Sequence, residues 1–279
     1  MSKLGIIAGG GDLPRAVAEA AREGGREVFV VSLTGKNDDW TTQFSCEAVS
    51  LGEMGKTLRA LSSNNCKDII FAGKVDRPRL SDVRLDTKGA LLMPRVAAVA
   101  LKGDDALLRA IVEIFEKEGY RVVSIAEAAP SLVVRKGNVG KHSPSSDSLK
   151  DVAKGFEVVA RLGELDIGQA AAVCDGLVLA VEAAEGTDAM LKRVAELPER
   201  LRGTPAKPRG VLVKAPKPIQ DGKTDLPVIG IQTVKNVAAA GLAGIAVEAN
   251  RALIVDRENV VRAADAANIF IVGLEPAKA

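Results

Sequence analysis

The sequence predicts an α/β protein with two domains, and three observations lead to this prediction. Short apolar runs alternate with helical patterns from the first residues onward, as in parallel sheets that are covered by helices. The chain has 279 residues, which is more than one domain usually holds. A segment rich in Gly, Ser and Pro, residues 135–148, interrupts the alternation near the middle. We expect a Rossmann-like parallel sheet in an N-terminal domain, residues 1–130, and a mixed-sheet α/β domain over residues 131–279.

In the N-terminal domain the apolar spacing predicts strands at 3–8, 27–33, 46–51, 68–73 and 121–126, and helices at 14–23, 53–64, 81–101 and 104–117. The stretch 88–101 is apolar nearly all round if it is helical. Such a helix is usually buried, and the alternative is that it lines a channel for acyl chains.

In the C-terminal domain the same spacing predicts helices at 149–164, 187–197, 234–243 and 258–268, and strands at 176–183, 210–215, 227–233, 244–249, 252–256 and 269–274. The longest apolar runs are interrupted by Arg95 or Asp175, so we expect no transmembrane helix. The first ten residues turn glycine-rich too soon for a signal peptide.

The composition argues against nucleic-acid binding. Aromatic residues make up 3% of the chain and the formal net charge is +2, so neither base stacking nor a basic surface is supported. Cys46, Cys66 and Cys174 are far apart, with no CxxC pair, which is typical of a protein of the reducing cytoplasm.

His142 is the only histidine. A Ser-His-Asp triad, a zinc site of the HExxH type and a histidine-rich dinuclear centre are therefore all disfavoured. Any metal ion is expected to be Mg²⁺ or Mn²⁺, held by carboxylates, water and substrate oxygens.

The stretch "AGGGDLP", residues 8–14, follows a predicted strand and opens a predicted helix. Such a turn is a natural seat for phosphate, through Gly10, Gly11 and Asp12. It is not an NAD fingerprint, because Pro14 stands where the third glycine belongs and no acid ends the second strand. The alternative is a tight turn in which Asp12 caps the helix.

Two further turns follow predicted strands. "AGKVDRP", residues 72–78, offers Lys74 and Arg77 to a phosphate, and the alternative is a solvated basic turn. "VEAAEGTDAM", residues 181–190, begins a helix with Thr187 or Asp188; Thr187 suits an N-cap, and the N–H groups behind it suit an anion. Plain capping explains this second turn equally well.

Residues 213–233, "VKAPKPIQDGKTDLPVIGIQT", combine Lys214 and Lys217 with Asp221 and Asp225. Hydrolysis of a phosphate anhydride uses cations to neutralise the diphosphate and a carboxylate to hold a metal ion or orient water. A polar surface loop whose charges cancel is the alternative, but a loop of about twenty residues with little regular structure is uncommon unless it has a function.

The motifs "GIIAGGGDLP", "AGKVDRP", "GDDALLRAIVEIFEKEG", "AVEAAEGTDAM" and "KAPKPIQDGKTDLPVIG", in this order, resemble the LpxI-type UDP-2,3-diacylglucosamine pyrophosphatases of bacterial lipid A biosynthesis. The resemblance covers nearly the whole chain. It implies hydrolysis of the diphosphate to UMP and 2,3-diacylglucosamine 1-phosphate (lipid X) with a divalent cation, two α/β domains that hold the lipid between them, and a homodimer.

The resemblance also implies roles for individual residues. Asp225 is the expected catalytic residue, as metal ligand or water-positioning base, with Asp221 beside it. The residues expected around the diphosphate and sugar are Gly10, Gly11, Asp12, Lys74, Asp76, Arg77, Thr187, Asp188, Lys214, Lys217 and Gln220. We expect a cytoplasmic protein with peripheral contact with the inner membrane.

Two other functions stay open at this point. One is another nucleotide-sugar hydrolase or a transferase, which would not require acyl chains. The other is a carrier or sensor that binds an acylated sugar phosphate without turnover. A binding protein gains nothing from acids beside a diphosphate unless a cation bridges them, so the Lys and Asp residues of 213–233 favour hydrolysis.

Overall fold

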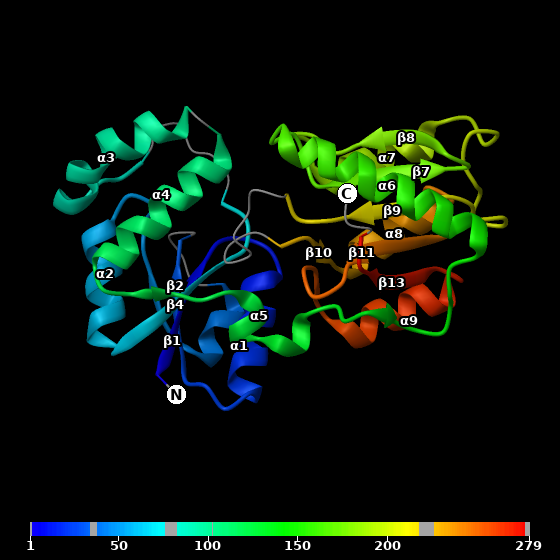
Figure 1. The fold of residues 1–279 in the computed structure, drawn as a ribbon. Helices are drawn as coiled ribbons and strands as arrows, with labels where there is room; N and C mark the ends of the chain where they lie inside the picture. Colours follow the sequence, from blue (N-terminus) through cyan, green and yellow to red (C-terminus); the bar gives the residue numbers. More distant parts are fainter. Residues whose placement is uncertain (1, 34–37, 76–82, 102, 218–225, 277–279) are drawn as a thin grey trace. The chain divides into compact units, whose positions relative to one another are not determined.

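The computed structural model describes residues 2–33, 38–75, 83–101, 103–217 and 226–276. The chain divides into two compact units, Met1–Leu132 and Val133–Ala279 (Figure 1). The first contains a parallel sheet and the second a mixed sheet, each with helices on both faces. The predicted α/β class is confirmed.

The sheet of the first unit has the strand order β3-β2-β1-β4-β5, with every pair parallel. Its strands are β1 Lys3–Ala8, β2 Val28–Ser32, β3 Ser45–Ala48, β4 Cys66–Ala72 and β5 Arg121–Val122. The chain winds outward from β1 in one direction and from β4 in the other, so the switch point lies between these two strands. Ligands of open α/β sheets bind at the carboxyl edge of such a point.

The helices of this unit are α1 Leu13–Glu23, η1 Asp39–Gln43, α2 Met54–Ser63, α3 Thr87–Ala100, α4 Asp104–Lys117, α5 Ile125–Ala128 and η3 Pro130–Leu132. Helices α2 and α4 cover one face of the sheet, where Leu58, Leu61 and Phe115 pack against strand residues. Helices α1 and α5 contact the sheet from the other side, and α3 packs on α2 and α4 (Figure 1).

The structure corrects the expectation that the apolar stretch 88–101 is buried. Among the residues of α3 only Gly89 is buried, and Leu91 is 80% exposed. The start of the helix is fixed by Asp86, which accepts hydrogen bonds from the backbone N–H of Gly89 (2.8 Å) and of Lys56 (2.9 Å) on α2. The helix thus packs on α2 and α4 along one side, and its other residues remain half-buried or exposed.

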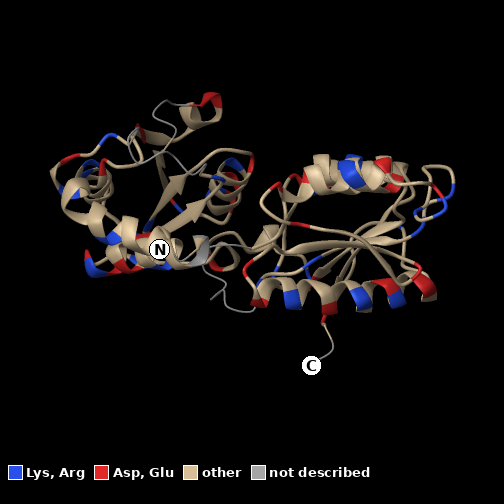
Figure 2. Cartoon of the chain, turned by 90° about the horizontal axis from the view of Figure 1, so that it is seen from above, with Lys and Arg blue, Asp and Glu red and all other residues tan. Residues whose placement is uncertain are grey.

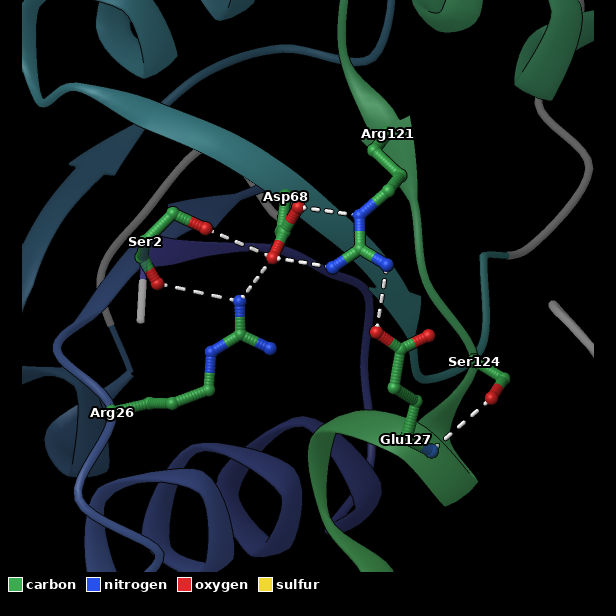
Figure 3. Close-up of polar contacts among 6 residues, drawn as sticks. All are labelled: Ser2, Arg26, Asp68, Arg121, Ser124 and Glu127. Atoms are coloured by element: carbon green, nitrogen blue, oxygen red, sulfur yellow. Dashed lines mark hydrogen bonds and ion pairs between the residues drawn. The ribbon is translucent and has the colours of Figure 1, made fainter.

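A buried ionic network lies at the amino edge of the same sheet (Figure 3). Asp68 of β4 accepts hydrogen bonds from Arg26 (2.5 Å), from two nitrogens of Arg121 (2.8 Å each) and from Ser2 (2.9 Å). Arg121 also pairs with Glu127 at 2.8 Å. The hydrogen bonds from Arg121, followed by those from Ser2 and Arg26, lower the pKa of Asp68 to about 2 although its burial opposes this. The network ties β4 to β5 and to the chain around β1.

The sheet of the second unit has the order β6-β13-β11-β9-β7-β8. Strands β9, β11 and β13 are parallel, whereas β7 is antiparallel to β9 and to β8, and β6 is antiparallel to β13. The strands are β6 Gly137–Asn138, β7 Ala170–Cys174, β8 Leu177–Val181, β9 Val211–Lys214, β11 Gly244–Glu248 and β13 Phe270–Leu274. A separate parallel pair joins β10 Val228–Ile229 to β12 Leu253–Ile254.

The helices of the second unit are α6 Ser146–Glu164, α7 Gly186–Glu196, α8 Ile231–Ala239 and α9 Arg257–Ala266. Helix α6 packs on one face of the sheet, and α7, α8 and α9 pack on the other. Along β9, Val211 and Val213 face α6 while Leu212 faces α7 to α9, as the two-residue period of a strand requires.

Lys and Arg are interspersed with Asp and Glu along the outer surfaces (Figure 2). On α6, for example, basic residues pair with acids three residues away, as in Lys150–Asp147, Lys154–Glu157 and Arg161–Glu164. Exposed pairs of this kind contribute little to stability.

Candidate active site

In the first unit the structure brings together the two turns that follow β1 and β4. Gly10 and Lys74 form an antiparallel bridge, in which Gly10 N–H donates to the Lys74 carbonyl (2.7 Å) and Lys74 N–H donates to the Gly10 carbonyl (2.9 Å). The N–H of Gly9 donates to the Ala72 carbonyl at 2.8 Å. The two turns therefore meet at the switch point, on the carboxyl edge of the sheet.

The glycines make this close approach feasible. A Cβ on Gly9 would lie 2.4 Å from the Lys74 carbonyl oxygen, and one on Gly73, whose φ is +92°, would lie 2.7 Å from the Gly10 carbonyl oxygen. Gly11 has φ +88° but open space around a Cβ. Gly9 and Gly73 thus serve the contact between the turns, and Gly11 serves the backbone conformation at the start of α1.

The alternative interpretation, in which the side chain of Asp12 caps α1, is wrong. Asp12 stands at the N-cap position, but its side chain accepts no hydrogen bond from the helix, and its φ of −82° and ψ of −16° are helical rather than extended. Gly11, Asp12 and Lys74 are all exposed. The first unit therefore presents an ammonium group, a carboxylate and the first N–H groups of α1 near one point, which suits an anionic or hydroxylated ligand.

In the second unit Lys214 ends β9 and is only 5% exposed. Its register places it on the same face as Leu212, toward α7 and α8. Its Nζ donates to the carbonyl of Val228 at 3.1 Å, just before α8 begins. A buried ammonium group is costly unless polar or anionic groups surround it, and Lys214 places such a positive charge at the carboxyl end of β9.

Thr187 and Asp188 lie in the first turn of α7. Thr187 is not the N-cap that the sequence predicts, because the helix begins at Gly186 and Glu185 takes that position. The Thr187 hydroxyl instead donates to Oε1 of Glu182 at 2.7 Å. Asp188 accepts a hydrogen bond from Asn236, in the second half of α8, at 2.8 Å, which joins the start of α7 to α8.

These groups share one edge of the second sheet. Ala170, the first residue of β7, pairs with Lys214, and the N–H of Glu182, just past β8, donates to the Ala170 carbonyl at 2.9 Å. Since β8 and β9 run in the same direction, their carboxyl ends meet there, with Lys214 and Glu182 on either side of β7. The edge combines a buried cation with the first turns of α7 and α8, a setting that favours phosphate.

Lys217 follows the end of β9 and forms an ion pair with Asp166. Its ammonium group contacts a carboxylate oxygen of Asp166 at 2.5 Å, with both side chains partly covered. Asp166 follows α6 and was not among the predicted site residues. Lys217 is thus positioned beside the same edge by a neighbouring acid.

Glu182 is the residue of this site that sequence reasoning missed. It is 8% exposed, and its second oxygen accepts the N–H of Gln169 at 3.2 Å. A signal was present, because Ala180 packs in the core and a residue two positions later shares its side of the strand. An acid at a core-facing position at a strand end is the pattern that would have identified it.

Five predicted site residues, Asp76, Arg77, Gln220, Asp221 and Asp225, lie outside the described residues. Within the described ranges, no three His, Cys, Asp or Glu side chains are grouped so that they could hold a metal ion. Mg²⁺ needs only one or two carboxylates, with water and substrate phosphate completing its shell. Asp225 thus stays the predicted metal ligand, and Asp221 stays a predicted catalytic residue.

Comparison with known proteins places both units in one family. Family models described as LpxI N-terminal domain and LpxI C-terminal domain match residues 3–132 and 135–272. A relative from Caulobacter vibrioides, named UDP-2,3-diacylglucosamine pyrophosphatase LpxI, is 46% identical over 276 residues, covering 99% of each chain. The chain therefore belongs to the LpxI family.

Proposed function

We propose that this protein hydrolyses the diphosphate of UDP-2,3-diacylglucosamine. One water is consumed, the P–O–P bridge breaks, and the products are UMP and 2,3-diacylglucosamine 1-phosphate. The observation that carries the proposal is the 46% identity to the Caulobacter enzyme over 99% of both chains, because this match includes the two phosphate-compatible edges described above.

The described side chains support an electrostatic role in this reaction. Lys214 and the first turn of α7 offer positive charge and N–H donors at one sheet edge, and Lys74 with the first turn of α1 offers them at the other. Such groups stabilise the negative charge that grows as the bridging oxygen departs. Glu182 orients the Thr187 hydroxyl at 2.7 Å, and the proposed contacts to diphosphate and sugar further include Gly10, Gly11, Asp12, Asp76, Arg77, Asp188, Lys217 and Gln220.

Asp225, with Asp221, is proposed to orient the attacking water or to hold a divalent cation, Mg²⁺ or Mn²⁺. A cation bound there would neutralise phosphate oxygens and polarise the phosphorus. The carboxylates that we assign to this task are oxygen ligands, which suit these hard ions.

Assembly and location are proposed from the same family relationship. We propose a cytoplasmic homodimer that contacts the inner membrane peripherally. Cys46, Cys66 and Cys174 are free thiols, as a reducing compartment maintains. No helix among the described residues is long and apolar enough to cross a membrane.

The reaction is tested by following UMP release from purified protein with UDP-2,3-diacylglucosamine and Mg²⁺, with and without EDTA, beside Asp225→Ala. We expect release that requires the cation and Asp225. Tight binding of the lipid without release would instead indicate a carrier. Equal cleavage of UDP-glucose would indicate a nucleotide-sugar hydrolase that ignores acyl chains.

Lys214 provides a sharper test of the described site. Lys214→Met keeps the length of the buried side chain and removes its charge, so we expect kcat/KM to fall by about 10²-fold or more. Lys192→Met, an exposed residue of α7, is the matched control and should leave kcat/KM unchanged. A Lys214→Met enzyme with wild-type kcat/KM and thermal stability would remove Lys214 from the site.

A further inference from the structure

The exposed large hydrophobic side chains of the first unit are gathered in one region. Among the described residues of that unit they are Leu51, Val75, Leu85, Leu91 and Leu101. Leu51 and Val75 follow β3 and β4, and Leu85 pairs with Gly52 in a bridge. These three therefore lie at the carboxyl edge of the sheet, where Gly10 meets Lys74.

Helix α3 begins at this edge and carries the most exposed members of the group. A Cβ on Gly89 would lie 2.0 Å from the Gly52 carbonyl oxygen, so the first turn of α3 rests directly on the turn after β3. Leu91 is 80% exposed, and Leu101, just past the helix, is 90% exposed. The apolar surface of α3 is thus continuous with the edge that holds the candidate site.

Several exposed apolar residues of α3, with the residue that follows it, form one stripe. Leu91, Pro94, Ala98 and Leu101 are all exposed, and their spacing of three and four residues places them on one side of the helix. A surface helix ordinarily turns its polar side outward, whereas the outward side of this helix is mainly apolar, with Thr87 and Arg95 as its exposed polar members.

Both charged side chains of α3 are paired with acids of the protein, although Arg95 is exposed beside the stripe. Of the 14 residues of α3 only Lys88 and Arg95 are charged. Lys88 pairs with Glu118 at 2.5 Å and Arg95 pairs with Glu113 at 2.6 Å, and Glu113 belongs to α4 while Glu118 directly follows it. Because acids of the protein already compensate both cations, attraction to anionic lipid contributes little and burial of apolar surface dominates.

We propose that the outward stripe of α3 docks on the surface of a lipid bilayer, with Leu91 and Leu101 inserted among the acyl chains. This inference rests on the proposed function, because a substrate with two acyl chains resides in the bilayer and has to be reached there. The stripe begins at the sheet edge where the polar head of that substrate would bind. A bilayer therefore fits this surface better than a second copy of the chain, which would cover the approach to the edge.

The test is flotation of the full-length protein with phosphatidylcholine vesicles and with vesicles that also contain phosphatidylglycerol. We expect binding to both, with little dependence on salt. Leu91→Asp and Leu101→Asp should each weaken binding at least about tenfold, without a change in Tm because the side chains are exposed. Leu177→Asp, at a residue of the second unit that is also exposed, is the matched control and should bind as the wild type does.

Activity separates this inference from the proposed function. With the lipid substrate in vesicles, Leu91→Asp should release UMP at least about tenfold more slowly than wild type, in proportion to its lost binding. With a short-chain analogue dissolved as monomers, both should be equally active. An active wild type that does not float with vesicles would overturn the docking proposal alone, whereas vesicle binding without any UMP release would overturn the proposed function alone.

Two further results would overturn the docking proposal. If Leu91→Asp slowed UMP release from the monomeric analogue as much as it slows release from substrate in vesicles, Leu91 would contact the substrate rather than the bilayer. Dissociation of a dimer by Leu91→Asp in sedimentation velocity would mean that a second copy covers α3.

Discussion

Asp68 is the centre of the ionic network at the amino edge of the first unit's sheet. Its carboxylate compensates the buried Arg26 and binds Arg121 through two nitrogens. A buried ion pair contributes little more to the stability of the fold than well-packed apolar residues would. Removing one partner is costly, however, because it leaves a buried charge uncompensated. The network therefore specifies how the starts of β4 and β5 join.

We predict that acid weakens this unit through Asp68. Its pKa is about 2 in the folded chain against 3.8 as the ordinary value. The stabilisation, about 2 kcal/mol, is therefore complete above pH 3.8 and disappears as the pH falls toward 2. Urea unfolding at neutral pH and near pH 2 measures it.

Asp68→Asn should cost about 3–5 kcal/mol at neutral pH, because Arg26 is left buried without its partner. The variant should also lose less stability than wild type on acidification. Asp147→Asn removes an exposed partner of Lys150 and should cost less than about 0.5 kcal/mol. Equal costs for the two variants would contradict the assigned role of Asp68.

At the scale of elements, the turn after β1 needs glycine at two positions for different reasons. Gly9 is needed for a close backbone contact, and Gly11 is needed for its positive φ. Gly9→Ala places a Cβ 2.4 Å from a carbonyl oxygen, whereas Gly11→Ala meets nothing within 4 Å and strains only a backbone at φ +88°. We expect Gly11→Ala to cost about 1 kcal/mol and Gly9→Ala to cost about 3 kcal/mol or more, because the backbone of the paired turn has to move.

Thermal unfolding and UMP release test this difference. Gly119→Ala is the control, since its φ is +89° with open space in a turn far along the chain, and its cost should match that of Gly11→Ala. Gly9→Ala should also reduce UMP release, because it displaces Lys74, whereas Gly119→Ala should leave UMP release unchanged. Equal stability of the Gly9 and Gly11 variants would mean that the Gly10–Lys74 bridge is not formed in solution.

Most elements could be predicted from the sequence, and the exceptions have physical reasons. Strand β7 escaped prediction because Ala170, Ala171 and Ala172 have little β-propensity, although helices on both faces of the sheet bury them completely. The predicted strand 227–233 ends at Ile229 instead, because Gly230 is the N-cap of α8, which begins at Ile231. Helix α3 was predicted as a helix but not as an exposed one. An apolar composition does not reveal whether neighbouring elements of the fold cover the helix.

At the scale of the whole molecule, the sequence could predict which turns share a sheet edge but not their contacts. Parallel strands alone bring the turns after β1 and β4 to one edge. The backbone bridge between Gly10 and Lys74 joins residues that are far apart in the sequence. It forms only because both turns have conformations that allow their backbones to pair. The partnership of Thr187 with Glu182 replaced a predicted cap for a similar reason, because a tertiary acid competes with the helix for the hydroxyl.

The two units provide the last prediction, because each has its own sheet and its own buried core. Residues around Ile7, Leu61 and Phe115 form a core in the first unit, and those around Met190, Leu212 and Ile271 form one in the second. We expect the separate chains 1–132 and 133–279 each to unfold cooperatively on heating and to show dispersed amide resonances.

The boundary itself is testable, because Val134 belongs to the second unit through two backbone hydrogen bonds. Its N–H donates to the Ala252 carbonyl (2.9 Å), and its carbonyl accepts the N–H of Asn250 (2.8 Å). A chain that begins at residue 136 loses both bonds and a fully buried valine, so its Tm should fall well below that of 133–279, by a stability loss of about 2–4 kcal/mol. If 133–279 were unfolded alone, or if the shorter chain were equally stable, the division of the molecule at Leu132 would be wrong as a folding boundary.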